Sequence, residues 1–226
     1  MAHAGWHRRG YLPHFDAPQA MHALTYRLAD AIPQDALERI QRQHAAFPDD
    51  ERARRLRSAI ERFSDAGAGS CVLADPRCAR IVRDNWQHFA GRRYHLIAWV
   101  IMPNHAHVLI QVLAGHPLPR IVNSWKSYTS SRINRLLGRS GALWMPDYWD
   151  RYIRDAAHAK ACLHYIEQNP VSAGLMARAE DWAWSSAAQR EGGPAGRVPD
   201  GESSQDLVAS YKGGPAGRVP DGESPR

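Results

Sequence analysis

The two most apolar segments of the chain stand on either side of a single tight turn. Residues 94–102 (YHLIAWVIM) and 105–113 (HAHVLIQVL) are rich in β-branched and aromatic side chains, and Pro103-Asn104 separates them. Strand-forming runs joined by a two-residue turn are typical of a β-hairpin. Because both arms are strongly apolar, we expect this hairpin at the centre of a sheet, with the core built around it.

The rest of the chain predicts an alternation of helices and strands around this hairpin. Proline and aspartate mark several helix starts, and a glycine or a proline marks several ends. In order, we expect a strand at 21–28, polar helical sequence at 33–63 with a break near Phe47-Pro48, a helix at 75–90, the hairpin, a helix at 121–137, a short strand at 147–153, and a helix at 156–169 capped by Asp155 and stopped by Pro170. This order predicts an α+β fold, an antiparallel sheet with helices packed on it.

The C-terminal part of the chain differs in composition from the rest. The segment GGPAGRVPDGES at 192–203 recurs unchanged at 213–224. Glycine and proline at this density, with few large apolar residues, do not support a packed unit, and two copies are too few for a solenoid. We therefore predict one domain over residues 9–190 and a flexible tail over 191–226.

The charge balance and the absence of targeting signals narrow the class of protein. The 29 lysines and arginines outnumber the 23 acidic residues, which favours polyanionic partners. No apolar run approaches the roughly 20 residues needed to cross a bilayer, and the first residues lack the apolar stretch of a secretory signal. Cys71, Cys78 and Cys162 are too few for a disulfide framework. We expect a cytoplasmic, nucleoid-associated protein with no membrane partner, either a monomer or a homodimer.

His105 and His107 are the first candidates for a functional site. One residue separates them in the second arm of the hairpin, so both side chains leave the same face of the sheet. Two imidazoles placed in this way can chelate one divalent ion. An isolated HxH motif is more often two polar residues on an exposed strand, but burying two imidazoles in an apolar hairpin without a partner would be costly. The context therefore favours a metal site.

Two other kinds of HxH metal site fit the neighbouring residues poorly. A metallo-β-lactamase-type site needs an aspartate two residues after the second histidine, where this chain has Leu109. A cupin-type site needs a glutamate shortly after the pair, where Gln111 and Val112 stand.

The helix expected at 156–169 carries a candidate nucleophile. Its apolar stripe is formed by Ala159, Cys162, Leu163 and Ile166. Tyr165 and Asn169 are four residues apart and share an adjacent face. A tyrosine hydroxyl can attack a phosphodiester, and a carboxamide one turn away can supply a neutral oxygen ligand. Most helix tyrosines are structural, so the case for Tyr165 depends on the histidine pair.

Several motifs together resemble one known family. Residues 99–109 (WVIMPNHAHVL) are similar to the metal-binding hairpin of the HUH single-tyrosine transposases. More narrowly, the chain resembles the REP-associated tyrosine transposases, which act on repetitive extragenic palindromes. Further matches lie at 9–15 (RGYLPHF), 165–175 (YIEQNPVSAGL) and 181–186 (DWAWSS). The resemblance covers nearly the whole folded region.

The resemblance implies a fold, a reaction and a set of site residues. The fold would be the HUH transposase fold, an RRM-like or ferredoxin-like antiparallel sheet with flanking helices. His105, His107 and Asn169 would take the metal-ligand positions, for Mg²⁺ or Mn²⁺, and Tyr165 the nucleophile position. The reaction would be cleavage and strand transfer of single-stranded DNA through a 5′-phosphotyrosine. The helical stretch at 33–63 is longer than a minimal transposase needs, and we expect neither it nor the tail to touch the site.

We expect basic side chains to bind the DNA. Arg132, Arg135 and Arg139 lie along one side of the helix at 121–137, and Arg8 and Arg9 lie at an expected mobile end. With Trp125 for base stacking, these side chains suit single-stranded or hairpin DNA. An ordinary solvated helix face would have the same pattern.

Three alternatives stay open at this level. The first is a catalytically silent binder of hairpin DNA or RNA on an RRM-like sheet, although no RNP pattern of aromatic residues is present. The second is another kind of HUH nuclease, with Tyr152 as the competing nucleophile. The third is a relic whose site no longer turns over, although the chain keeps every group that the reaction needs.

Overall fold

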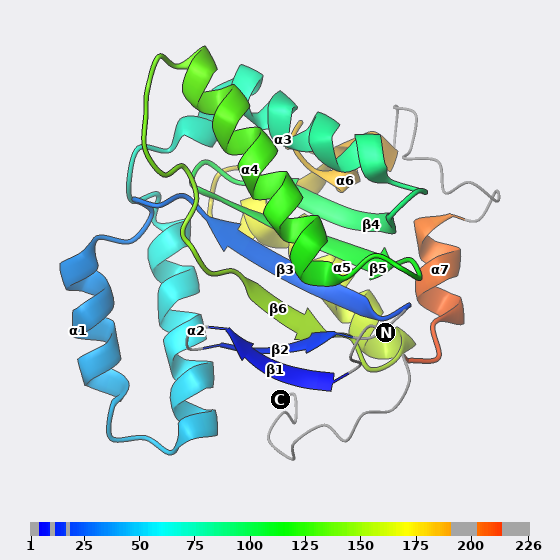
Figure 1. The fold of residues 1–226 in the computed structure, drawn as a ribbon, viewed down its shortest axis with the longest axis horizontal. Coiled ribbons are helices and arrows are strands. Elements are labelled where there is room, and N and C mark those ends of the chain that lie inside the picture. Colours follow the sequence, from blue (N-terminus) through cyan, green and yellow to red (C-terminus); the bar gives the residue numbers. More distant parts are fainter. Residues whose placement is uncertain (1–4, 10–11, 17–18, 191–202, 214–226) are drawn as a thin grey trace.

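A four-stranded antiparallel sheet forms the centre of the protein in the computed structural model, which describes residues 5–9, 12–16, 19–190 and 203–213 (Figure 1). Its strands are ordered β4 (Tyr94–Ile101), β5 (His105–Val112), β3 (Met21–Arg27) and β6 (Trp149–Tyr152). The predicted hairpin is confirmed, and β5 lies in the interior of the sheet. The strands and the helices that connect them follow the β-α-β-β-α-β order of a ferredoxin-like sheet. The predicted α+β fold is therefore confirmed.

Helices cover both faces of this sheet. On one face, α3 (Pro76–Phe89) and α4 (Leu118–Leu136) pack against the strands (Figure 1). On the other face, α5 (Ala156–Ser172) packs against β4 and β5. Because side chains of a strand alternate between faces, Leu24 contributes to the first core and Met21 to the second. His105 and His107 share the face that carries α5.

The long helical stretch after the first strand forms two helices, α1 (Gln34–His44) and α2 (Asp49–Asp65). They meet at the break predicted near Phe47-Pro48, where Pro48 precedes the first turn of α2. At the N-terminal end, β1 (Gly5–Arg9) pairs with β2 (Leu12–Asp16) in a separate two-stranded sheet. The short elements are η1 (Val72–Ala74), η2 (Ala179–Asp181) and α6 (Ser186–Arg190).

The N-caps of α3 and α5 are the residues that the sequence predicted, but α5 does not end where the sequence predicted. The side chains of Asp75 and Asp155 accept hydrogen bonds from backbone amides in the first turns of α3 and α5, as expected of N-caps. Pro170 does not stop α5, which continues to Ser172. The prediction of an end at Asn169 was therefore wrong by one turn, and Gly174, with φ of +70°, follows the actual end.

The predicted tail is also partly wrong. Residues 191–202 and 214–226 lie outside the described residues, but α7 (Ser204–Ser210) stands between them and packs on the sheet beside α5. Leu207, Val208 and Tyr211 are buried there. The Tyr211 hydroxyl accepts a hydrogen bond from the backbone amide of Met21 and donates one to the carbonyl of Ile153. The nine residues between the repeat copies therefore belong to the folded body, because their apolar side chains have helical spacing and Ser203 starts the helix with a capping box.

None of the helices in the described part of the chain is long and apolar enough to cross a membrane.

Candidate active site

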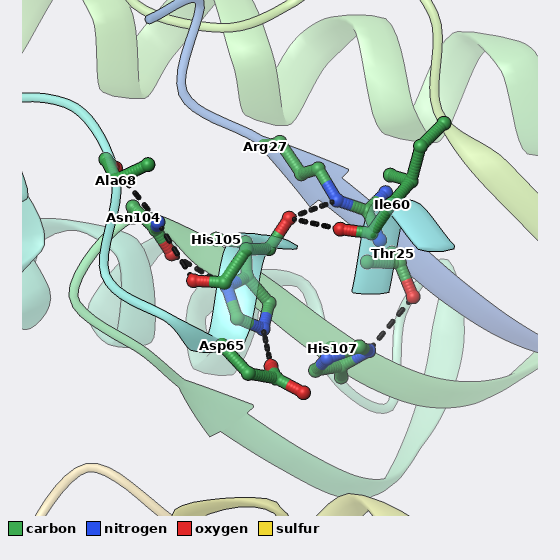
Figure 2. A network of polar contacts seen from close by, with 9 residues as sticks. Thr25, Arg27, Ile60, Asp65, Ala68, Asn104, His105 and His107 are labelled. Carbon is green, nitrogen blue, oxygen red and sulfur yellow. Dashed lines mark hydrogen bonds and ion pairs between the residues drawn. The ribbon is translucent and has the colours of Figure 1, made fainter. Parts of the chain in front are cut away.

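His105 and His107 lie side by side in the interior of the protein. Their side chains are 1% and 2% exposed, and their ring centroids are 4.8 Å apart (Figure 2). The prediction that both histidines leave one face of a central strand is therefore confirmed. Each ring uses one nitrogen in a local contact, His105 Nδ1 with Asn104 Oδ1 at 2.7 Å and His107 Nδ1 with Thr25 Oγ1 at 2.7 Å.

Asn104 fixes the protonation of the His105 ring. Its amide nitrogen donates to the carbonyls of Ser64 and Ala68, both at 2.9 Å, so its amide oxygen must face His105. An amide oxygen only accepts hydrogen bonds, so Nδ1 of His105 carries the proton and donates it. The other nitrogen, Nε2, then has a free lone pair. An imidazole held in this way by an outer hydrogen bond is typical of a metal ligand.

The electrostatic surroundings keep both rings neutral. Burial lowers the pKa of His105 well below its usual value, and the neighbouring His107 and Arg27 lower it further. Burial, followed by Arg27, lowers the pKa of His107 to about 3. Within the described residues, Nε2 of His107 is buried and has no hydrogen-bond partner. Neutral imidazole is the form that binds a metal, so these residues fit a divalent ion.

The last turn of α2 brings two carboxylates into the site, contrary to the expectation that the 33–63 stretch does not touch it. Asp65 Oδ1 is 3.6 Å from His105 Nε2 (Figure 2). Burial, followed by repulsion from Glu61, raises the pKa of Asp65 to about 6, while Arg27 acts in the opposite direction. Sequence reasoning missed both acids, because nothing in a polar amphipathic helix distinguishes these two from its solvated charges.

Tyr165, which belongs to α5, lies next to the histidine pair. Its ring lies edge-on to that of His107, with centroids 5.8 Å apart. The tyrosine is 45% exposed. Partial burial, followed by the nearby charges of Glu61 and Asp65, raises its pKa above the ordinary value. The phenol is therefore protonated at neutral pH.

Tyr165 lines a cavity between α2, the sheet and α5. The cavity has a volume of about 130 Å³, and its lining includes His107, Tyr165, Glu61, Arg57, Trp149 and Cys162. The Arg57 guanidinium lies over the Trp149 ring at 5.0 Å. A cation and an aromatic ring beside the tyrosine are suited to a phosphate and a base of a nucleic acid strand.

The segment at 181–186 holds α5 against the edge of the sheet. The indole of Trp182 donates to the carbonyl of Ile101 at 3.0 Å. The Ser186 hydroxyl donates to Glu167 of α5 at 2.8 Å and accepts from the Trp99 amide of β4 at 3.1 Å. This buried link fixes the position of α5, and with it Tyr165, relative to the strands.

Tyr152, the competing nucleophile, is on the wrong side of the sheet. It pairs with His22 in the β3–β6 register, whereas the Thr25 side chain contacts His107. His22 and Thr25 are three positions apart on β3, which is an odd spacing, so their side chains leave opposite faces of the sheet. The Tyr152 ring contacts that of His22, with centroids 6.1 Å apart. The structure therefore brings Tyr165 rather than Tyr152 to the histidines.

Asn169 is 2% exposed and lies one turn after Tyr165 on α5. Its Oδ1 accepts no hydrogen bond from the described residues, which leaves this oxygen free for a ligand. In the described part of the chain, no group of three or more His, Cys, Asp or Glu side chains is already arranged to hold a metal ion. The role of Asn169 as a ligand stays a prediction.

The predicted DNA-binding residues are scattered. Trp125 is fully buried, and its indole nitrogen donates to the Tyr94 hydroxyl, so the prediction that it stacks on DNA was wrong. Arg132 and Arg135 on α4, and Arg139 just after it, lie on the side of the sheet away from Tyr165. The backbone of Arg8 and Arg9 is paired in β1 rather than forming a mobile end, and their side chains lie outside the described residues.

Part of the chain is similar to known transposases. Residues 75–169 match the family model described as "Transposase IS200 like". A curated relative, the REP-associated tyrosine transposase of Escherichia coli, is 26% identical over 94 residues, which are 42% of this chain and 54% of the relative. The match thus spans about half the length of that relative.

A solved structure of a REP-associated tyrosine transposase bound to a REP hairpin aligns over 97% of this chain and 100% of its own, with a TM-score of 0.45 and 17% identity. The matched segment at 75–169 contains both histidines, Tyr165 and Asn169. Over that segment, which holds the candidate site, the chain is similar to the IS200-like transposases.

Proposed function

We propose that this protein cleaves single-stranded DNA and joins it to a new strand, with Tyr165 as the nucleophile. The observation that carries the proposal is the contact between the rings of Tyr165 and His107, which come from different parts of the fold. A phenol on a partly exposed residue, beside two neutral, buried imidazoles, fits a phosphodiester transfer site.

His105 and His107 would hold a divalent ion, Mg²⁺ or Mn²⁺, through their Nε2 atoms. When bound, this ion supplies Lewis-acid chemistry, polarising the scissile phosphate. The free lone pair of His105 and the unpartnered Nε2 of His107 support this assignment. Asn169, whose buried Oδ1 accepts no hydrogen bond from the described residues, is the proposed neutral oxygen ligand.

The reaction balances with the groups present. The Tyr165 oxygen attacks the phosphorus, a bond from phosphorus to oxygen forms, and the bond to the departing 3′-oxygen breaks. The products are a 5′-phosphotyrosine and a free 3′-hydroxyl. Glu61, whose side chain lines the same cavity as Tyr165, is placed to take the phenol proton, and the departing 3′-oxygen takes up a proton from water. A second 3′-hydroxyl reverses the step and joins a different strand, so no external energy source is needed.

The proposed substrate is single-stranded or hairpin DNA at palindromic repeats. The curated relative is named for its association with such elements, and this chain has an excess of basic residues. Arg57 lies inside the cavity beside the nucleophile, where it can contact a phosphate next to the scissile one. Arg132, Arg135 and Arg139 are proposed to bind a more distant part of the DNA.

The test is covalent adduct formation. The protein is incubated with Mn²⁺ and single-stranded DNA containing the palindromes that flank its own gene, and a denaturing gel detects protein–DNA adducts. Adduct is expected from the wild type and from Tyr152→Phe. It should be absent from Tyr165→Phe and strongly reduced in His105→Ala. Adduct formation by Tyr165→Phe would refute the assignment of the nucleophile.

A wild-type protein that binds the hairpin tightly but never forms adduct would instead favour the silent hairpin-binding alternative. In that case the geometry of the site would be a remnant rather than a working centre.

A further inference from the structure

Helix α2 contributes to the site although it lies outside the segment that matches the family model. We propose that Asp65, at the last position of this helix, is a ligand of the divalent ion bound by His105 and His107. The inference rests on the proposed function, because it concerns the same ion. It adds an anionic ligand from a part of the chain that the resemblance treats as an extension.

The distance between Asp65 and His105 is longer than a hydrogen bond and close to the separation of two ligands of one ion. The 3.6 Å from Oδ1 to Nε2 is too long for a hydrogen bond between these atoms. Two ligands at about 2.1 Å from one ion, at an angle between about 90° and 110°, are roughly 3.0 to 3.5 Å apart. A movement of a few tenths of an ångström by the aspartate would therefore let both atoms bind the same ion.

The network that orients His105 also holds Asp65. Asn104 accepts from the His105 ring and donates to the backbone carbonyls of Ser64 and Ala68, on either side of Asp65 in the chain (Figure 2). The Arg27 side chain donates to the Ser64 hydroxyl at 2.9 Å, which fixes the end of α2 to β3. The same network thus holds both side chains near each other, although among the described residues His105, His107 and Asp65 do not form a ligand group until the aspartate moves.

The charge of the site also calls for a carboxylate. Two imidazoles bring no negative charge to a dication, and Arg27, which pairs with His105 in the β3–β5 register, places a cation nearby (Figure 2). Mg²⁺ and Mn²⁺ prefer oxygen ligands, whereas imidazoles alone suit Zn²⁺, Ni²⁺ or Cu²⁺. An anionic oxygen from Asp65 offsets the repulsion by Arg27 and moves the preference of the site toward the hard ions that phosphoryl transfer uses.

The first test measures Mn²⁺ binding to the full-length protein without DNA, by calorimetry and by the loss of the free-Mn²⁺ paramagnetic signal. Asp65→Asn should weaken binding by at least about 10-fold, since even outer hydrogen-bond partners of metal ligands are worth 10- to 100-fold. Glu51→Gln is the matched control, because Glu51 lies on the same helix in an exposed pair with Arg55. Its affinity should equal that of the wild type. An affinity of Asp65→Asn within two-fold of the wild type, or no Mn²⁺ binding by the wild type, would overturn the proposal.

The second test reports ligation directly. Asp65→Cys places a thiolate at the same position, and Co²⁺ bound by it should show a thiolate-to-cobalt charge-transfer band. The wild type, with its own cysteines including Cys162 in the cavity, and Glu51→Cys should lack that band. Circular dichroism and thermal unfolding confirm that each variant is folded. A folded Asp65→Cys protein without the band contradicts the assignment.

The two proposals fail separately. If Tyr165→Phe keeps forming DNA adducts while Asp65→Asn loses Mn²⁺, the nucleophile is wrong and the ligand stands. If Tyr165→Phe loses adducts while Asp65→Asn binds Mn²⁺ normally, the function stands and the ligand is wrong.

Discussion

The ring of Tyr165 stands perpendicular to that of His107, at an interplanar angle of 85° with centroids 5.8 Å apart. The tyrosine belongs to α5 and the histidine to the interior strand β5, so the contact exists only because α5 packs on that face of the sheet. The link from Ser186 to Glu167 and to β4 holds the helix there. The nucleophile is therefore positioned by the fold rather than by its neighbours in the chain.

Removing the Tyr165 hydroxyl should separate chemistry from folding. Tyr165→Phe is expected to abolish adduct formation while changing the free energy of unfolding by less than about 1 kcal/mol, because the side chain is 45% exposed. Chemical denaturation and the adduct assay measure the two effects. A loss of several kcal/mol would show that the tyrosine is structural.

Asn104 is expected to matter for both stability and metal binding. Asn104→Ala leaves the carbonyls of Ser64 and Ala68 without their donor and frees the His105 ring. We expect a loss of about 2 to 4 kcal/mol in unfolding free energy, from unsatisfied buried groups, and a 10- to 100-fold loss in Mn²⁺ affinity. Calorimetry and denaturation check both. Unchanged Mn²⁺ affinity in a folded variant would mean that Asn104 does not orient the ligand.

Tyr211 should stabilise the body of the protein although it lies between the repeat copies. Tyr211→Phe removes the group that accepts from the Met21 amide and donates to the Ile153 carbonyl, at a cost of about 1 to 3 kcal/mol. Lys212→Ala, at the exposed neighbouring residue, is the control and should be neutral. Equal stability of the two variants would argue that α7 is not docked in solution.

Trp125 and Arg132 should have opposite phenotypes, although both were expected to bind DNA. Trp125→Ala empties a fully buried position and should cost about 3 to 5 kcal/mol. Arg132→Ala should leave stability unchanged but weaken DNA binding and lower the salt slope by about 1, the value for one phosphate contact. Binding titrations at several salt concentrations measure this slope. A salt slope equal to that of the wild type would show that Arg132 does not contact the DNA.

Local sequence determined the strands of the central sheet, most of its helices and the histidines and tyrosine of the site, but it did not predict β1, β2 or α7. The hairpin at Pro103-Asn104, the caps Asp75 and Asp155, and the shared face of His105 and His107 all follow from periodicity and capping, which act over a few residues. The tyrosine helix was also predicted, and its end was misjudged only because a proline is tolerated in a last turn when the helix is already packed.

Tertiary packing decided what periodicity cannot encode. Amphipathic spacing marked α4 but not which of its aromatic residues enters the core, so Trp125 was misassigned. α7 was not predicted, because it lies between two repeats that are rich in glycine and proline. The helix depends on docking against Ile153 and Met21. Asp65 and Glu61 reach the site only because α2 ends beside the hairpin turn.

The sequence by itself determined the order of the central strands and the helices between them, the paired histidines on one face and the candidate tyrosine, because each depends on interactions between residues close in the chain. Only the tertiary structure decided which tyrosine meets the histidines and which acids surround them. Those contacts join segments far apart in the chain, and their geometry is set by the packing of whole helices on the sheet.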